Sequence, residues 1–372
     1  MANKAIVYAI YPNAVQDEQC QKTFGCCRFV YNQMLTVQQT RYKEKEKHLS
    51  KTGANNYCNQ RLKEEFPFLR EVDKFALTNA VYHLEDGYER FFKRLGGFPK
   101  YKNKHRAGKS YTTNFTNGNI EVGENYVKLP KLGKVKAKIH RTAKENWVLK
   151  SATVRQNRDG SYQVSVLYEY KEAVLSQIPS SENTIGFDYK SDGLYADSNE
   201  NICGMPHYYR KSAQKLAKTQ RKLRHKVIGS NNYNKQQKRI AKIHRHTANQ
   251  RKDFLQKEST AIAKQYAFMC VEDLNMKALS NKGFGNGKAT LDNGYGMFLT
   301  MLEYKLKDKG GQLVKVDKFY PSSQICHNCE AMHPEMKDLS IRTITCDCGY
   351  SADRDHNSAK NIKTEGLRLL TA

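Results

Sequence analysis

The spacing of hydrophobic and polar positions changes several times along this 372-residue chain, and each change predicts a different kind of element. Residues 3–11 are largely apolar and favour a β-strand. Residues 16–95 place apolar side chains three and four positions apart, which predicts helices. After a Gly-Gly-Phe-Pro break at 96–99, residues 100–175 alternate in short runs between turn residues, which predicts strands. We therefore expect a small β-barrel or curled sheet that includes strand 3–11 and brackets a helical insert.

The second half of the chain has the pattern of an α/β domain. Residues 174–182 have the composition of a linker, and NTIGFDY at 183–189 follows as an apolar strand. A second buried strand stops at Glu272. An amphipathic helix, a strand and a final helix follow. This alternation of strands and helices is typical of an α/β domain.

The segment between these two strands is strongly basic. Residues 207–257 hold 16 Lys and Arg and a single acid, Asp253, and a break at 228–232 predicts a hairpin of two long helices. Such runs are usually solvated surfaces, but few acids are available here to pair with the charge. We therefore expect contacts to nucleic-acid phosphates, from Arg210, Lys211, Lys218, Arg221, Arg224, Lys235, Lys238, Arg239, Lys242 and Arg245.

The composition of the whole chain supports a polyanionic partner. Lys and Arg number 63 against 37 Asp and Glu, which gives a formal charge of +26. A basic membrane-surface protein is the competing interpretation, but no 18-residue apolar run is present. The N-terminus also lacks the apolar core of a signal peptide. We expect a cytoplasmic protein (prokaryotic cytosol or nucleoid) with no membrane partner and no small-molecule substrate.

Four of the ten cysteines are clustered. Cys326 and Cys329 form one pair, Cys346 and Cys348 form a tighter pair, and 16 residues separate the two. Two such pairs joined by a hairpin supply the four thiolates of a closed, structural zinc site. An iron–sulfur cluster is the smaller alternative, and His327 or Asp347 could replace a thiolate.

Acidic residues stand at the ends of three predicted elements. Asp188 ends the strand TIGFD, Glu272 ends AFMCVE, and Asp353 and Asp355 open the final helix. Each has an ordinary explanation, because exposed acids are common at strand ends and Asp is a frequent N-cap. Together they suggest a site for two Mg²⁺ ions that would cut a phosphodiester. We assign Asp355 as the ligand and Asp353 as the cap.

The order of these motifs, GFD, VEDL, SSQxCxxC, CxCG and DRDxNxAxNI, resembles TnpB, a family of transposon-encoded nucleases related to type V CRISPR effectors. YPNAVQ, FGCCRFVYN and GFPKYK in the first part of the chain are similar to that family as well. The resemblance implies an RNA-guided DNA endonuclease with a guide RNA from the transposon end. Its target would be double-stranded DNA beside a short element-specific motif. The implied catalytic acids are Asp188, Glu272 and Asp355.

The resemblance also implies an architecture. It consists of an α/β RNase H-like (RuvC) nuclease domain with an inserted zinc ribbon, and of a β-barrel wedge domain with a helical recognition insert. The corresponding ranges are 1–11 and 96–180 for the wedge, 12–95 for the insert, 181–372 for the nuclease and 320–352 for the ribbon.

Three positions depart from the family pattern. Lys190 and Glu330 stand where glycine is usual, and the second cysteine pair is one residue shorter. None of these removes an acid, so an active enzyme is expected, and Lys190 is the departure most able to alter the rate. The alternatives are an RNA-guided repressor without cleavage, a transposase or DNA-binding accessory protein, and a zinc-ribbon RNA-binding factor.

Overall fold

The computed structural model describes residues 2–104, 107–171, 174–281 and 287–372. The chain divides into two compact units, Met1–Glu172 and Ala173–Ala372. The described residues 174–183, at the start of the second unit, contain no helix or strand. No helix of the described chain is both long and apolar enough to cross a membrane.

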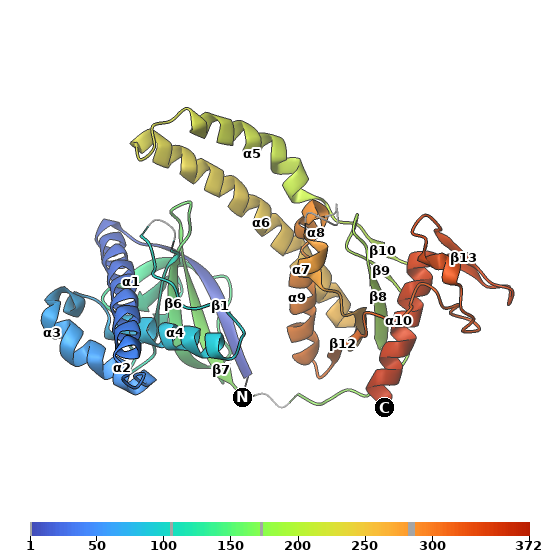
Figure 1. The fold of residues 1–372 in the computed structure, drawn as a ribbon, viewed down its shortest axis with the longest axis horizontal. Coiled ribbons are helices and arrows are strands. Elements are labelled where there is room, and N and C mark those ends of the chain that lie inside the picture. The colour runs from blue at the N-terminus through green and yellow to red at the C-terminus, as the bar shows by residue number, and fades with distance from the viewer. Residues whose placement is uncertain (1, 105–106, 172–173, 282–286) are drawn as a thin grey trace. The chain divides into compact units, whose positions relative to one another are not determined.

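The first unit is built on a seven-stranded antiparallel sheet with the order β2-β6-β7-β1-β5-β4-β3 (Figure 1). The strands are β1 (Ala2–Tyr11), β2 (Lys109–Asn114), β3 (Glu121–Val122), β4 (Tyr126–Leu129), β5 (Gly133–Lys138), β6 (Val148–Gln156) and β7 (Tyr162–Tyr170). The predicted strand at 3–11 is confirmed, and burial alternates along β7 as the pattern required. β2 and β3 are edge strands that do not pair with each other within the described residues. Within the described residues no pairing of these edges closes the sheet, so it is open, which agrees with the curled-sheet alternative and not with a closed barrel.

Helices cover one face of this sheet and share its core. They are α1 (Ala14–Lys43), α2 (Lys51–Tyr57), the π-helix η1 (Cys58–Leu62), α3 (Lys63–Glu65), the 3₁₀-helix η2 (Pro67–Glu71) and α4 (Lys74–Phe92). Phe24 and Leu84 from the helices belong to the same buried cluster as Tyr8 and Val164 from the sheet. The helical segment 12–95 is thus part of one folding unit with the sheet, and its recognition role stays a prediction.

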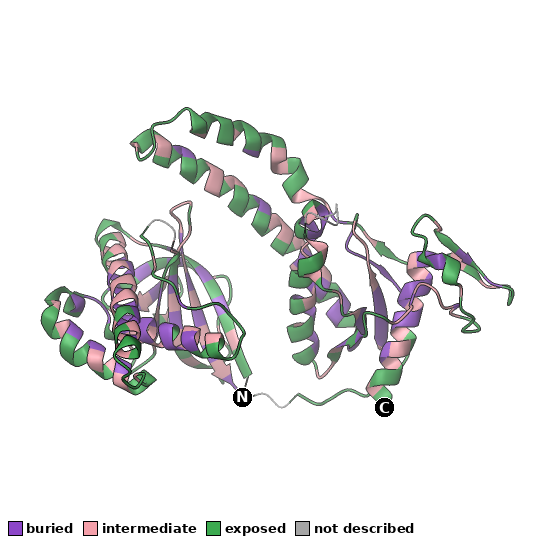
Figure 2. Cartoon of the chain, in the orientation of Figure 1, coloured by how far each residue is buried: buried purple, intermediate pink, exposed green. Residues whose placement is uncertain are grey.

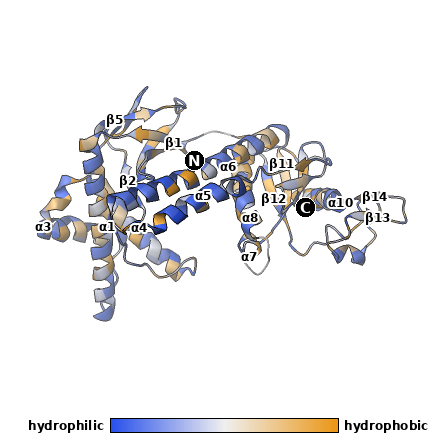
Figure 3. Cartoon of the chain, turned by 90° about the horizontal axis from the view of Figure 1, so that it is seen from above, coloured by the Kyte–Doolittle hydropathy of each residue, from blue (hydrophilic) through white to orange (hydrophobic). Residues whose placement is uncertain are grey.

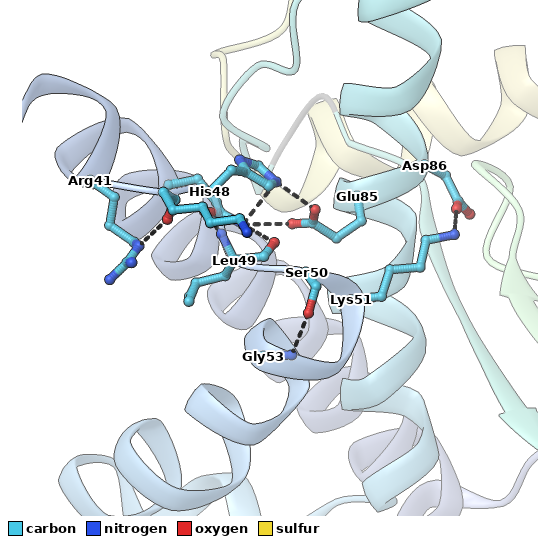
Figure 4. Close-up of polar contacts among 10 residues, drawn as sticks. Arg41, His48, Leu49, Ser50, Lys51, Gly53, Glu85 and Asp86 are labelled. Atoms are coloured by element: carbon cyan, nitrogen blue, oxygen red, sulfur yellow. Dashed lines mark hydrogen bonds and ion pairs between the residues drawn. The ribbon is translucent and has the colours of Figure 1, made fainter. Parts of the chain in front are cut away.

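A buried carboxylate ties the loop after α1 to α4 (Figure 4). Glu85 is buried; its Oε1 accepts a hydrogen bond from Gln38 Nε2 at 3.0 Å, and its Oε2 lies 2.7 Å from His48 Nε2. Ser50 then caps α2 by accepting the Gly53 amide at 3.1 Å. These contacts fix the turn between the two helices, since the buried acid has its hydrogen bonds satisfied there.

The second unit contains a five-stranded mixed sheet with the order β10-β9-β8-β11-β12. Its strands are β8 (Thr184–Tyr189), β9 (Tyr195–Asp197), β10 (Ile202–Cys203), β11 (Phe268–Glu272) and β12 (Gln312–Val316). β8, β11 and β12 run parallel, whereas β9 and β10 are antiparallel to their neighbours. The helices are α5 (Tyr208–Arg224), α6 (Asn231–Gln265), α7 (Met276–Leu279), α8 (Gly287–Asn293), α9 (Tyr295–Lys307) and α10 (Arg354–Thr371). The predicted basic hairpin is α5 and α6, and α6 continues to the start of β11.

The two faces of this sheet carry different layers (Figure 1). Phe187 of β8 and Val271 of β11 belong to the cluster that also holds residues of α6 and α9. The alternate residues face α10, where Cys270 clusters with Ile362. Since successive side chains of a strand point to opposite faces, Asp188 and Glu272 lie on the α10 side.

Two glycines let α10 lie close to the sheet. A Cβ atom on Gly186 would stand 2.2 Å from the carbonyl oxygen of Ala359, and one on Gly366 would stand 2.1 Å from Cys270 Sγ. Any larger side chain at either position would push the helix away. The glycine of the GFD motif is therefore a packing requirement that places α10, and Asp355 with it, over the strand that carries Asp188.

Candidate functional site

The three predicted acids line one pocket. In the parallel pair β8 and β11, Gly186 is opposite Cys270 and Phe187 is opposite Val271, so Asp188 and Glu272 are the next residues along their strands. Asp355 comes to the same place from the first turn of α10. The pocket is open and measures about 630 Å³. It lies at the carboxyl ends of the parallel strands, where α/β sheets usually bind their ligands.

Asp353 has the predicted capping role. It precedes α10, and its side chain accepts the backbone N–H of Asp355 at 2.8 Å. This hydrogen bond fixes the start of the helix and leaves the Asp355 carboxylate to the pocket.

Two of the acids are held in a setting that disfavours their charge. Burial raises the pKa of Asp188 well above its usual range, and the negative charges of Glu272 and Asp355 add to the rise. Burial also raises the pKa of Glu272, although the hydrogen bond from Ser322 at 2.7 Å opposes it. A bound cation would offset this repulsion, so the donor set fits a divalent metal ion with oxygen ligands.

Asp355 is already paired with two cations. Its Oδ2 accepts hydrogen bonds from Lys190 Nζ at 2.8 Å and from Arg342 Nη2 at 2.5 Å. Burial alone would raise the pKa of Asp355, but these two partners outweigh burial and lower it. Among the described residues, a separate candidate metal site is formed by the four clustered cysteines, whose sulfur atoms all lie within 4.8 Å of one another.

The cysteines form a compact cluster on the loops before α10. The Sγ atoms of Cys326 and Cys348 are 3.7 Å apart, and those of Cys329 and Cys346 are 3.5 Å apart. Four sulfurs at about 2.3 Å from a tetrahedral zinc ion would be about 3.8 Å from one another, so the arrangement fits zinc. The second pair follows β13 (Thr343–Thr345), which pairs with β14 (Ser351–Asp353), and the 3₁₀-helix η4 (Pro334–Lys337) lies between the two pairs. All ten cysteines are free of disulfides.

Glu330 is one of the three departures from the family pattern, and its backbone conformation is one that glycine favours. It follows the first cysteine pair and has a φ of 64°, in the left-handed region that favours glycine. The backbone therefore keeps the conformation that a glycine would adopt there.

The basic hairpin extends from the sheet as a largely exposed arm of the second unit (Figure 2). All ten residues predicted to contact phosphate are exposed. The residues of the two helices are largely hydrophilic (Figure 3), and Leu216 of α5 and Leu255 of α6 are among their few buried apolar side chains. α5 and α6 meet partly through polar contacts, such as the 2.9 Å hydrogen bond from Gln236 Nε2 to the Thr219 carbonyl.

Sequence reasoning missed several residues at these places. Near the hairpin tip an open pocket of about 440 Å³ is lined by Lys235 and Arg239, which were predicted, and by Lys222, His225 and Lys226, which were not. At the acid pocket it missed Arg342 and Ser322. The pairing of Ser322 with Glu272 had one available signal, since Ser322 opens the SSQ motif before the first cysteine pair.

The fold and pocket define a basic α/β protein with an acid-lined site suited to metal-dependent chemistry on a polyanion. Three family models match the chain: a "Helix-turn-helix domain" at 1–47, a "Probable transposase" at 163–282 and a "Cas12f1-like, TNB domain" at 295–362. The second contains Asp188 and Glu272, and the third contains the cysteines and Asp355. In the structure, the described residues 2–43 of the first are one strand and one helix, β1 and α1.

Relatives cover nearly the whole chain. A protein of Streptomyces pristinaespiralis named "Putative RNA-guided DNA endonuclease" is 31% identical over 370 residues, which is 98% of this chain and 89% of the relative. The "Putative RNA-guided DNA endonuclease InsQ" of Escherichia coli (strain K12) is 28% identical over 99% of this chain and 93% of its own length. The chain belongs to the TnpB family that these relatives represent.

A solved structure shares the fold. The structure titled "Cryo-EM structure of the Cas12f1-sgRNA-target DNA complex" matches 94% of this chain and 82% of its own chain, with a TM-score of 0.60 and 13% identity. This likeness shows a common fold.

Proposed function

We propose that this chain is an RNA-guided DNA endonuclease that cuts target DNA by metal-dependent phosphodiester hydrolysis. The observation that carries the proposal is the convergence of Asp188, Glu272 and Asp355 on one pocket of a chain with a charge of +26. The names of the relatives and the guide RNA and target DNA in the Cas12f1 complex support it. The proposal also includes two Mg²⁺ ions at the site, cutting beside a short element-specific motif, and action in the cytoplasm.

The sheet supports a RuvC-type, RNase H-like assignment for residues 181–372. The order β10-β9-β8-β11-β12, with β8, β11 and β12 parallel and with β9 antiparallel to both β8 and β10, is the strand order of that fold. Residues 320–352 would be its zinc ribbon. The sheet at 1–11 and 96–180 would serve as the wedge domain, and the helices at 12–95 as the recognition insert.

The residues of the pocket would have different roles in the proposed reaction. Asp188, Glu272 and Asp355 would hold the metal ions, which supply an activated water and stabilise the leaving oxygen of a phosphodiester. Asp353 orients the first turn of α10. Arg342 and Lys190 lie at the same opening, and their positive charges attract the DNA backbone that the acids would otherwise repel.

The hairpin would hold nucleic acid by its backbone. α5 and α6 present exposed Lys and Arg over two long helices, and the single acid among residues 207–257, Asp253, already pairs with Lys257 at 2.7 Å. Contacts of this kind grip the phosphates without reading the bases, so sequence would be read by pairing with the guide.

The zinc assignment has its own test. Replacing Cys326 with Ser should remove zinc and disorder the ribbon, because structural zinc supplies folding free energy. Cys203 lies outside the cluster, so Cys203→Ser is the matched control and should keep its zinc. Zinc content by atomic spectroscopy decides between them, and a Cys326→Ser protein with wild-type zinc would refute the assignment.

The guide is tested by purification. The protein is expressed with its native flanking DNA, and the RNA that copurifies is sequenced. A dominant RNA whose 3′ part runs into flanking sequence supports the proposal. A heterogeneous mixture of cellular RNA would contradict guide binding and favour a transposase or a general RNA-binding factor.

A further inference from the structure

A buried polar network lies between the cysteine cluster and the acid pocket. Its members are Ser322, Asn357, Ser358 and Asn361, and each is less than 5% exposed. Ser322 opens the SSQ motif, Asn357 and Asn361 are the asparagines of DRDxNxAxN, and Ser358 lies between them; none is a proposed metal ligand. Buried polar side chains are costly unless they are hydrogen-bonded, so the contacts they make indicate what they are for.

The two asparagines tie the chain before the first cysteine pair to α10. Asn361 Nδ2 donates to the carbonyl oxygens of Ser322 at 2.8 Å and Ile325 at 2.7 Å. Asn357 Nδ2 donates to the same Ile325 carbonyl at 2.8 Å, and Asn357 Oδ1 accepts the backbone N–H of His327 at 3.1 Å. Because Asn357 and Asn361 are one helical turn apart, they grip one short segment from one face of α10.

The two serines continue the network to Glu272. Ser358 Oγ donates to Ser322 Oγ at 2.9 Å, and Ser322 Oγ donates to Glu272 Oε1 at 2.7 Å. A hydroxyl has one hydrogen to give, so accepting from Ser358 directs the hydrogen of Ser322 to the carboxylate. One oxygen of Glu272 is thereby fixed, and the other can ligate a cation in a set orientation.

We infer that Ser322 is a positioning residue for Glu272, and that Ser358, Asn357 and Asn361 hold it against α10. The inference rests on the proposed role of Glu272 as a metal ligand. Ser358 stands one helical turn after Asp355, so the network ties Glu272 and the cysteine-bearing loop to the helix that carries Asp355. Groups that orient a metal ligand in this way typically contribute 10–100-fold to metal affinity.

Ser322→Ala tests the inference in the full-length, zinc-loaded protein. Mn²⁺ binding is measured by isothermal titration calorimetry, and we expect roughly tenfold weaker binding with wild-type zinc content. Ser351→Ala is the matched control, because Ser351 is an exposed serine of the same ribbon. Ser358→Ala keeps the Ser322 hydroxyl but removes its donor, so a smaller loss of Mn²⁺ affinity is expected, and this variant also serves if Ser322→Ala does not fold.

Cleavage gives a second readout. A positioning role predicts that Ser322→Ala cuts DNA at nearly the wild-type rate once Mn²⁺ is saturating, and slowly at low Mn²⁺. Wild-type Mn²⁺ affinity in both variants, or a loss of rate that saturating Mn²⁺ does not restore, would overturn the inference. If the wild-type protein binds Mn²⁺ in a Ser322-dependent way but never cuts DNA, the proposed function fails and this inference stands.

Discussion

Lys190 Nζ lies 2.8 Å from Asp355 Oδ2, so a residue at a position where the TnpB pattern has glycine is bonded to a proposed metal ligand. Lys190 is 22% exposed and Asp355 13%, which places the ion pair away from full solvent screening. Arg342 shares the same oxygen. A metal ion that binds Asp355 must therefore displace the Lys190 and Arg342 side chains or share the carboxylate with them.

Removing Lys190 should strengthen metal binding. We expect Lys190→Met to bind Mn²⁺ roughly three- to tenfold more tightly, because one positive charge leaves the immediate surroundings of the ligand. Calorimetric titration measures the change. Lys360→Met is the matched control. Lys360 lies on the same helix as Asp355, is about as exposed as Lys190, and pairs with Glu200 at 2.7 Å. Weaker binding by Lys190→Met would mean that Lys190 supports the site and does not compete for it.

Asp188→Asn should abolish cleavage and stabilise the metal-free protein. The pKa of Asp188 is raised by burial and by Glu272 and Asp355, so its ionisation costs stability as the pH rises through that pKa. Asparagine removes the cost, and we expect a gain of about 1 kcal/mol at pH 8, or ~2–4 °C in the melting temperature. The gain should vanish at low pH, where the wild-type carboxyl is protonated.

Thermal melting at the two pH values, without added divalent metal and with zinc retained, checks this prediction. Asp192→Asn is the control, because Asp192 follows the same strand but is 77% exposed. An equal gain from both variants would show that the effect is general charge reduction and not the setting of Asp188.

Glu330→Gly should stabilise the cysteine-bearing loop. Glu330 has a φ of 64°, and a left-handed backbone costs an L-residue roughly 1–2 kcal/mol. The measurement is the rate of zinc release to a chelator, which should fall several-fold. Glu330→Ala removes the same carboxylate and keeps the strain, so it should release zinc no more slowly than wild type. Equal slowing by both would assign the effect to charge.

Neutralising the hairpin tip should weaken nucleic-acid binding without changing sequence preference. Lys235 and Arg239 line one exposed pocket of basic side chains, so the double variant to Ala should lower the slope of log K against log salt by about 2 if each contacts one phosphate. Filter binding across a salt series measures the slope. Lys257→Ala is the control, because Lys257 already pairs with Asp253 at 2.7 Å, and it should leave the slope nearly unchanged.

The outline of the acid-lined pocket could be predicted because it follows from local rules. Asp188 and Glu272 end apolar strands, and the parity of side chains along parallel strands puts both on one face. The spacing of the cysteines predicted the four-cysteine cluster. The scarcity of Asp and Glu between residues 207 and 257 predicted an exposed basic hairpin. Each of these signals lies within a few residues of sequence.

The remaining features depend on contacts between distant segments. The pairing of Ser322 with Glu272 spans 50 residues, and that of Lys190 with Asp355 spans 165. Val227 is apolar but 78% exposed, because α5 ends at Arg224 and leaves it outside the helix. An alternating pattern also cannot tell an open sheet from a closed barrel, since both bury every second side chain.

Cleavage of a chosen plasmid tests the central claim most directly. The purified complex is given a guide matched to the plasmid, and wild-type protein is compared with Asp188→Ala in Mg²⁺ and in EDTA. The account predicts Mg²⁺-dependent cutting at the guided site by wild type only, with equal plasmid binding by both proteins. Cutting by Asp188→Ala at the wild-type rate, or guided binding with no cutting by wild type, would contradict it.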